Sequence, residues 1–280
     1  MQLGSFNINI LHDGYFKLDG GAMFGVVPKM IWDRLELSDD RNRILMSANP
    51  VLVRTGEHTV LIDTGMGNKY DPQAVDNYDI ELPRTLMAEL RRLEVSPEEV
   101  DYVINTHLHF DHIGGNTYQD EDGLIKPVFP NAKYVMQKAE YEDAIDPGPR
   151  TKASYNHDDI VPLQESGQIM LIDGDIEVVP GIKMRVTGGH TRAHSIVQIE
   201  SEGQTAIFLA DLIPTSSHVK VPYVMGYDLY PADTADFKAE LLQEAAANDY
   251  LLLFEHSPRV KVGRIFYDDE EFRFRPEPFD

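Results

Sequence analysis

Three histidines and one aspartate fall within six consecutive residues, in the run HLHFDH at positions 107–112. Imidazole nitrogens bind zinc and related divalent ions, and carboxylate oxygens complete such sites. In an extended segment, His107 and His109 project to the same side and can hold one ion together. Asp111 and His112 diverge and can reach a second ion. The run therefore predicts a metal site; the alternative interpretation is a polar surface cluster at a strand-to-helix turn.

One hexapeptide cannot fill two coordination spheres, so further ligands must come from elsewhere. His190 follows Gly188-Gly189, Asp211 ends the apolar run AIFLAD, and His256 ends the apolar run LLLFEH. Each of these residues alone is more often structural than a ligand. Their shared position at the ends of three apolar strands favours a common metal site with the hexapeptide.

The composition excludes several partners and kinds of chemistry. Lysine and arginine number 25 against 47 aspartates and glutamates, and 25 − 47 gives a net charge of −22. Such a surface repels nucleic acid and anionic lipid, so we expect neither nucleic acid nor a membrane as a partner. The sequence contains no cysteine, which excludes thiolate ligands and thiolate nucleophiles. Metals must be held by imidazole and carboxylate.

The N-terminal stretch MQLGSFNINILHDGYF alternates polar and apolar residues and lacks the basic and apolar regions of a signal peptide. No apolar run approaches the roughly 18 residues that a membrane span requires. We therefore expect a cytoplasmic protein.

Hydrophobic periodicity predicts the elements that position these residues. Strands are expected at Phe6–Ile10, Val51–Arg54 and Thr59–Ile62, and a loop at 20–28 that is either a buried plug or a pocket wall. An amphipathic helix at 83–93 and a short helix after a capping box at 96–99 lead into a strand at 102–105, just before His107.

The second half repeats this order of strands and then helix. After a strand at Lys133–Gln137 and a helix from Lys138, the irregular segment 146–165 is expected to lie over an active site. Further strands are expected at Ile176–Val179, 183–187, 195–200, 205–209 and 250–254, and a helix at 232–247. No Ser/Gly linker separates the halves, so we expect residues 1–280 to form a single layered α/β domain.

The combination of HLHFDH, GGH at 188–190, AD at 210–211 and EH at 255–256 resembles the metal-binding motifs of the metallo-β-lactamase superfamily. The resemblance covers roughly residues 51–256 and implies a four-layer αβ/βα sandwich. It implies two divalent ions, zinc or alternatively iron, cobalt or manganese. The implied ligands are His107, His109 and His190 for the first ion, Asp111, His112 and His256 for the second, and Asp211 bridging both.

Two further residues match supporting positions of the same family. Asp63, in VLIDTG, matches an aspartate that accepts the free N–H of a ligating imidazole, although a turn-forming Asp-Thr-Gly is an equally simple interpretation. His194, in GGHTRAHS, matches a position beside the ligands. We assign no role to His12, His58 or His157.

Departures from the family pattern separate its branches. Diiron redox members carry glutamate at the position of His109, and β-lactamases often use a cysteine ligand and lack the bridging aspartate. The stretches LDGGAMFGVVPKMIW (18–32) and ADLIPT (210–215) resemble quorum-quenching N-acyl-homoserine lactonases of the YtnP type. The first stretch also resembles aryl esterases and organophosphate hydrolases, and thioesterases of the glyoxalase II branch share much of the metal pattern. A catalytically silent binding or sensor module is the alternative of a different class.

The resemblance implies that a metal-bridging hydroxide opens a lactone ring, because two metals about 3.5–4 Å apart acidify a shared water. Asp111 is the expected proton shuttle to the leaving group. Another group of lactonases has a catalytic tyrosine where this chain has Pro214. We expect a small-molecule lactone or ester as substrate and consider a homodimer possible. The expected substrate-binding residues are Met23, Phe24, Trp32, His218 and Tyr223, with Thr215 and Tyr227 as other nearby polar candidates.

Overall fold

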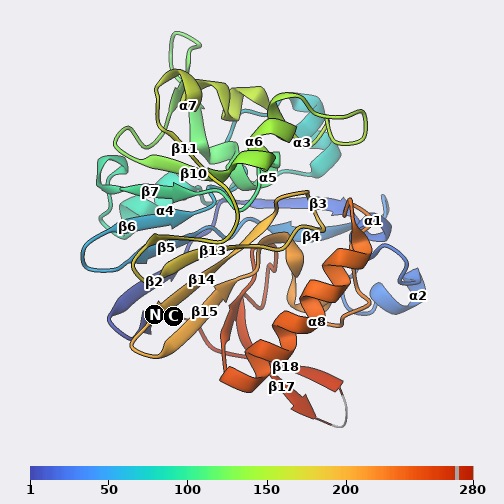
Figure 1. Cartoon of the computed structure of the whole chain (residues 1–280). Coiled ribbons are helices and arrows are strands. Elements are labelled where there is room, and N and C mark those ends of the chain that lie inside the picture. The colour runs from blue at the N-terminus through green and yellow to red at the C-terminus, as the bar shows by residue number, and fades with distance from the viewer. Residues whose placement is uncertain (269–270, 280) are drawn as a thin grey trace.

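Two seven-stranded mixed sheets face each other in the computed structural model, which describes residues 1–268 and 271–279 (Figure 1). The first sheet has the order β1 (Gln2–Leu3), β2 (Phe6–Ile10), β5 (Val51–Arg54), β6 (Thr59–Ile62), β7 (Tyr102–Ile104), β10 (Lys133–Gln137) and β11 (Ile169–Ile172). The second has the order β12 (Ile176–Val179), β13 (Ile182–Val186), β14 (Ser195–Ser201), β15 (Gln204–Phe208), β16 (Leu251–Leu253), β17 (Val262–Asp268) and β18 (Glu271–Pro276).

The space between the sheets is filled by the apolar side chains that alternate along their strands. In β2, for example, Phe6, Ile8 and Ile10 are buried, whereas the asparagines between them are only half-buried. Ile8 belongs to the same buried cluster as Val197 of β14 and Phe208 of β15. This period of two is what a sheet with one face in a core requires.

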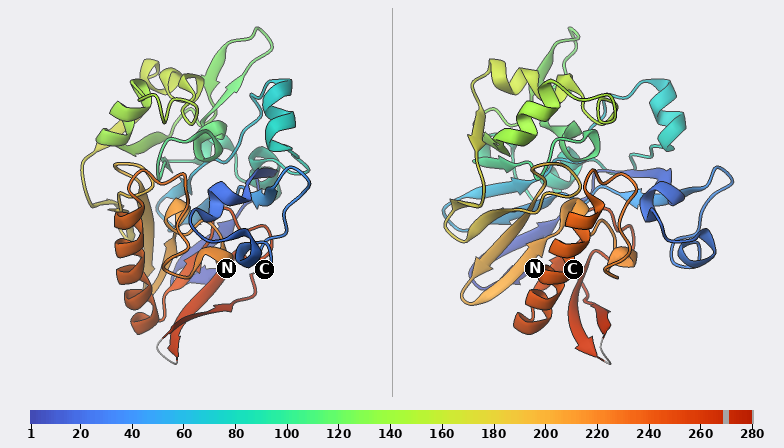
Figure 2. Two further views of the ribbon diagram at one scale, coloured as in Figure 1. Left: turned by 90° about the vertical axis from the view of Figure 1, so that its right-hand side faces the viewer. Right: turned by 45° about the vertical axis from the view of Figure 1, so that its right-hand side comes forward.

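Helices cover the outer faces of both sheets. On the first sheet, α4 (Leu86–Arg92), α6 (Lys138–Ile145) and α7 (Val161–Glu165) pack in one apolar cluster with the outward residues of the strands. On the second, α8 (Pro231–Asn248) runs along the sheet (Figure 2). The layers are therefore helix, sheet, sheet and helix, which confirms the predicted α/β sandwich. Shorter elements outside these layers include α3 (Pro72–Tyr78), α5 (Phe110–Ile113), β8 (Thr117–Gln119) and β9 (Ile125–Pro127).

An N-terminal lobe, residues 15–47, projects beside the sheets at the right of Figure 1. It consists of the hairpin β3 (Tyr15–Asp19) and β4 (Arg43–Ser47), with α1 (Gly20–Phe24) and α2 (Lys29–Trp32) between the two strands. The prediction of a loop over 20–28 was wrong at 20–24. The glycines there disfavour a helix, but Asp19 caps α1 by accepting the Ala22 N–H at 2.8 Å.

Other differences from the predicted elements lie at boundaries, in short helices and in strands that the sequence analysis does not predict. The helix expected from residue 83 begins at Leu86, because Thr85 caps it. The capping box is present, with Glu99 accepting the Ser96 N–H at 2.7 Å. Segment 146–165 is not irregular throughout, since it ends in α7. The antiparallel pair of strands β17 and β18 was not predicted. In the described parts of the chain, no helix is long and apolar enough to span a membrane.

Candidate metal centre

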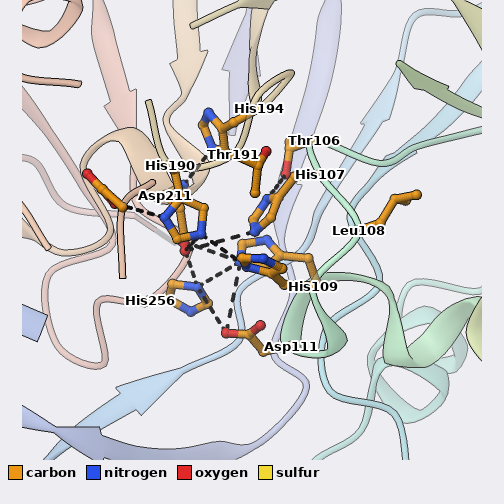
Figure 3. Close-up of polar contacts among 12 residues, drawn as sticks. Thr106, His107, Leu108, His109, Asp111, His190, Thr191, His194, Asp211 and His256 are labelled. Carbon is orange, nitrogen blue, oxygen red and sulfur yellow. Dashed lines mark hydrogen bonds and ion pairs between the residues drawn. The ribbon is translucent and has the colours of Figure 1, made fainter. Parts of the chain in front are cut away.

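The ends of strands from both sheets meet at one edge of the sandwich, and the candidate ligands lie there (Figure 3). His107 and His109 follow β7, and α5 begins directly after His109. Gly114 lets this turn pack against the loop after β6, because a Cβ at that position would lie 2.0 Å from the Met66 carbonyl oxygen. The other ligand-bearing segments follow β13, β15 and β16, and they contribute His190, Asp211 and His256.

The seven candidate ligands form two clusters, and within each cluster all donor atoms lie within 4.8 Å of one another. The first contains His107, His109, His190 and Asp211. Its closest contacts join His190 Nε2 to His109 Nδ1 at 3.1 Å and to Asp211 Oδ2 at 3.0 Å. Three imidazoles and one carboxylate oxygen thus converge on one point.

The second cluster contains Asp111, His112 and His256. The Nε2 atoms of His112 and His256 are 3.0 Å apart, and Asp111 Oδ2 lies 3.7 Å from His256 Nε2. Asp211 Oδ1 lies 3.3 Å from His112 Nε2 and 3.0 Å from His256 Nε2. Asp211 therefore directs one carboxylate oxygen to each cluster.

The arrangement of donor atoms fits divalent cations. Tetrahedral zinc ligands about 2.0–2.1 Å from the ion lie roughly 3.3 Å apart, close to the observed separations of 3.0 and 3.1 Å between imidazole nitrogens. His107 Nε2 is buried and has no hydrogen-bond partner among the described residues. Nitrogen and oxygen donors of this kind suit zinc, iron, cobalt and manganese.

Charge and burial oppose each other in the two clusters. Burial, and then the neighbouring imidazoles, lower the pKa of His107 and His109 well below its usual value. Burial acts in the same direction on His190 and His256, but the carboxylates around them together outweigh it and raise their pKa. These are Asp211 and Asp228 for His190, and Asp211 and Asp111 for His256. The buried negative charge of Asp211 is therefore stabilised by a positive charge nearby. Either a metal cation or a proton on a neighbouring imidazole can supply it.

The two supporting residues named from the sequence contact the clusters directly. Asp63 Oδ2 lies 2.9 Å from His112 Nδ1, and both carboxylate oxygens also accept hydrogen bonds from Thr106. His194 Nδ1 bonds to the Thr187 hydroxyl at 2.7 Å, and its Nε2 accepts the Asp211 N–H at 3.0 Å. His194 uses both ring nitrogens in this way and holds the backbone of Asp211.

Sequence reasoning missed two buried carboxylates at the site. Asp228 Oδ1 lies 2.8 Å from His190 Nδ1, and Glu140 bonds to residues next to His109 and His190. Asp228 lies in the irregular stretch before α8, and Glu140 lies in the first turn of α6. Neither follows a strand within a recognisable motif, so no local pattern marks them.

A cavity of about 290 Å³ opens over the two clusters. Its walls come from the N-terminal lobe, the segment 150–154 and the segment 225–229, so the segment 146–165 does reach over the site. The lining residues are Leu18, Met23, Tyr78, His109, Phe110, Asp111, Arg150, Thr151, Ala153, Ser154, His190, Asp211, Met225, Gly226, Tyr227, Leu229 and His256.

Among the expected substrate-binding residues, Met23 lines this cavity and the other four do not. Phe24 stacks on Trp32 and on His218, with ring centroids 5.7 and 4.2 Å apart, and Tyr223 packs in the same apolar cluster. Of the two neighbouring residues of α1, only Met23 reaches the cavity, and Phe24 packs in the apolar cluster. Tyr227, a polar candidate near Pro214 in the sequence, does line it.

Comparisons with known proteins agree with this geometry. Residues 43–256 match the model of the metallo-β-lactamase superfamily. The chain is 32% identical over 243 residues to an N-acyl homoserine lactonase of Bacillus cereus, covering 81% of this chain and 84% of the relative. A solved probable metal-dependent hydrolase from Staphylococcus aureus is 33% identical, with a TM-score of 0.90 and full coverage of both chains.

A more distant solved structure shares the fold. The dizinc quorum-quenching lactonase AidC, in complex with a product, is 23% identical with a TM-score of 0.79, over 100% of this chain and 97% of that one. Together, the superfamily match and the Bacillus relative show that this chain belongs to the metallo-β-lactamase superfamily of hydrolases and is related to the N-acyl homoserine lactonases.

Proposed function

We propose that this protein is a dinuclear-metal hydrolase that opens the lactone ring of N-acyl-homoserine lactones. The observation that carries the hydrolase part is the position of Asp211, which directs one oxygen to each of two ligand clusters. The relation to an N-acyl homoserine lactonase of Bacillus cereus supports the choice of substrate.

The seven clustered residues have defined roles in this proposal. His107, His109 and His190 would hold one ion, Asp111, His112 and His256 would hold the other, and Asp211 would offer one carboxylate oxygen to each. When bound, such a pair of ions supplies Lewis acidity and a nucleophile from water at neutral pH. We propose zinc, since its preferred ligands are imidazole and carboxylate when no thiolate is present.

Asp111 is the proposed acid–base residue. Its side chain lines the cavity, and its Oδ2 faces His256 and His112 at 3.7 and 4.0 Å. A carboxylate at the boundary between the ligands and the cavity can receive the proton of the attacking water and pass it to the departing ring oxygen.

The walls of the cavity suit a substrate with one polar and one apolar end. Leu18, Met23, Phe110, Met225 and Leu229 supply apolar surface for an acyl chain. Arg150, Ser154 and Tyr227 supply polar groups for an amide or a carboxylate. Small-molecule sites commonly combine a mostly apolar lining with a few polar groups in this way.

The test compares His109→Ala and Asp211→Ala with the wild type and with His58→Ala. His58 is a half-buried histidine on the turn before β6 and is a matched control. Both site variants should lose bound metal and lactone ring opening, measured by metal analysis and by acid release, and the control should keep both. Full activity in either site variant would disprove the mechanism. Faster turnover of a paraoxon-like ester or S-lactoylglutathione than of any homoserine lactone would disprove the substrate.

A further inference from the structure

The segment 225–230 is attached to the loop that carries His190 by three hydrogen bonds, two to His190 itself and one to Gly189. Asp228 Oδ1 lies 2.8 Å from His190 Nδ1. The backbone N–H of Leu229 donates to the His190 carbonyl at 3.1 Å, and that of Tyr230 donates to the Gly189 carbonyl at 2.8 Å. This part of the chain is therefore built onto the loop that carries His190.

The same segment forms one wall of the cavity. Met225, Gly226, Tyr227 and Leu229 line it, and Asp228 between them points away, into the protein. The other end of the segment is held to the N-terminal lobe, because the Gly226 N–H donates to the Ala22 carbonyl at 2.7 Å. One short segment thus connects the ligand loop with the substrate wall and the lobe.

Asp228 is well placed to orient His190. Its side chain is buried, with 3% exposure, and its second oxygen, Oδ2, has no hydrogen-bond partner among the described residues. A carboxylate that accepts the Nδ1–H of an imidazole fixes the tautomer in which Nε2 carries the free lone pair. His190 Nε2 is the atom that faces His109 and Asp211.

The two clusters are alike in this respect. Asp63 contacts Nδ1 of His112 in the second cluster as Asp228 contacts Nδ1 of His190 in the first, at 2.9 and 2.8 Å. By contrast, the Nδ1 of His256 faces a weaker acceptor, the Ser47 carbonyl, at 3.0 Å. Each cluster therefore has one imidazole backed by a buried carboxylate.

We propose that Asp228 is the positioning residue for His190 and that, through it, metal binding at the first cluster orders the 225–230 wall of the substrate cavity. This inference rests on the proposed metal site but not on the proposed lactone substrate. Its test therefore uses metal binding and fluorescence and no turnover, so a wrong substrate would leave its result unaffected.

The first measurement is zinc affinity of the metal-free protein in competition with a chromophoric chelator. Asp228→Ala should bind one of its two zinc ions about 10–100 times more weakly than the wild type, the usual effect of removing such a partner. Asp228→Asn should lose less, because its amide oxygen can still accept the Nδ1–H. The exposed Asp233, five residues further along, gives the matched control Asp233→Ala, which should bind both ions normally. Wild-type affinity for both ions in Asp228→Ala would overturn the proposal, and so would an equal loss at both sites.

The second measurement tests the coupling to the wall. Trp32 is the only tryptophan, and it shares an apolar cluster with Met225. Zinc added to the metal-free wild type should change the Trp32 emission, and the change should be absent in Asp228→Ala even at saturating zinc. Emission that does not respond to zinc in the wild type, or a full response in the variant, would overturn the coupling.

Discussion

Glu140 accepts a hydrogen bond of 2.6 Å from the hydroxyl group of Thr191, beside the ligand His190. Its other carboxylate oxygen accepts the backbone N–H of Leu108, between two further ligands, and the hydroxyl of Tyr155, both at 3.2 Å. One buried side chain from α6 therefore fixes the relative positions of two ligand-bearing segments that are about 80 residues apart in the sequence.

Replacement of Glu140 by alanine should destabilise the protein, because buried donors lose their acceptor at a cost of about 1–3 kcal/mol each. We expect the free energy of unfolding in urea to fall by about 3 kcal/mol, and by about 1 kcal/mol in Thr191→Val, which removes one of the bonds. The exposed Glu142 on the same helix provides the control Glu142→Ala. A stability of Glu140→Ala within about 0.5 kcal/mol of the wild type would contradict this role.

Gly114→Ala should disrupt the turn that carries the hexapeptide. The new Cβ would meet the Met66 carbonyl oxygen at 2.0 Å, and its three nearest atoms all belong to the backbone of Gly65 and Met66, so no flexible side chain can move aside. We expect a loss of about 3 kcal/mol or more in thermal or urea unfolding. Gly148→Ala is the control, since its nearest neighbour would be 4.0 Å away. Equal stability of the two variants would show that the turn relaxes freely.

The cavity wall should determine the preferred acyl chain. Leu18→Phe adds bulk on the apolar side of the cavity, whereas Leu45→Phe adds it to an exposed position of the paired strand β4. We expect Leu18→Phe to lower kcat/KM for a long-chain lactone about tenfold more than for a short-chain one, since one methylene group in a fitted pocket is worth about 10–200-fold. A uniform decrease for all chain lengths would indicate that the acyl chain binds elsewhere.

Lys238 of α8 should make stability depend on pH. Burial lowers the pKa of its ammonium group from 10.5 to about 7, although the Asp228 carboxylate acts in the opposite direction. Between these two values, the unfolded chain holds a proton that the folded protein has released, so the free energy of unfolding should rise as the pH rises from 7 to 10.5. Lys238→Met should lack this rise in urea unfolding across the same range. An identical pH dependence in both proteins would assign the effect to another group.

The sequence predicts the residues of the two clusters better than the residues that support them, for physical reasons. Histidine and aspartate at strand ends are recognisable because residue type and local context coincide, as at His107 and Asp211. Asp228 and Glu140 act through side-chain contacts with segments far away in the sequence, 38 residues from His190 in one case. No local pattern records such contacts.

The same reasoning explains the differences in the fold. The apolar strands and α8 were predicted because their apolar pattern repeats over more than one pleat of a strand or more than one turn of a helix. The five-residue helix α1 depends on a single cap at Asp19 and on the burial of Met23 and Phe24. Its two glycines give the opposite local signal, so only the tertiary packing decides its conformation.

The position of Asp228 between wall residues constrains how this enzyme can diversify. Substitutions at Leu18 or Arg150 reshape the cavity from segments that carry no proposed metal ligand. These segments also carry no carboxylate that orients a ligating imidazole. Substitutions at 225–229 reshape it from a segment that also orients His190. Lineages that acquire new substrates should therefore accumulate changes on the lobe and on 150–154 first, and should alter the 225–229 wall only with compensation at the metal centre.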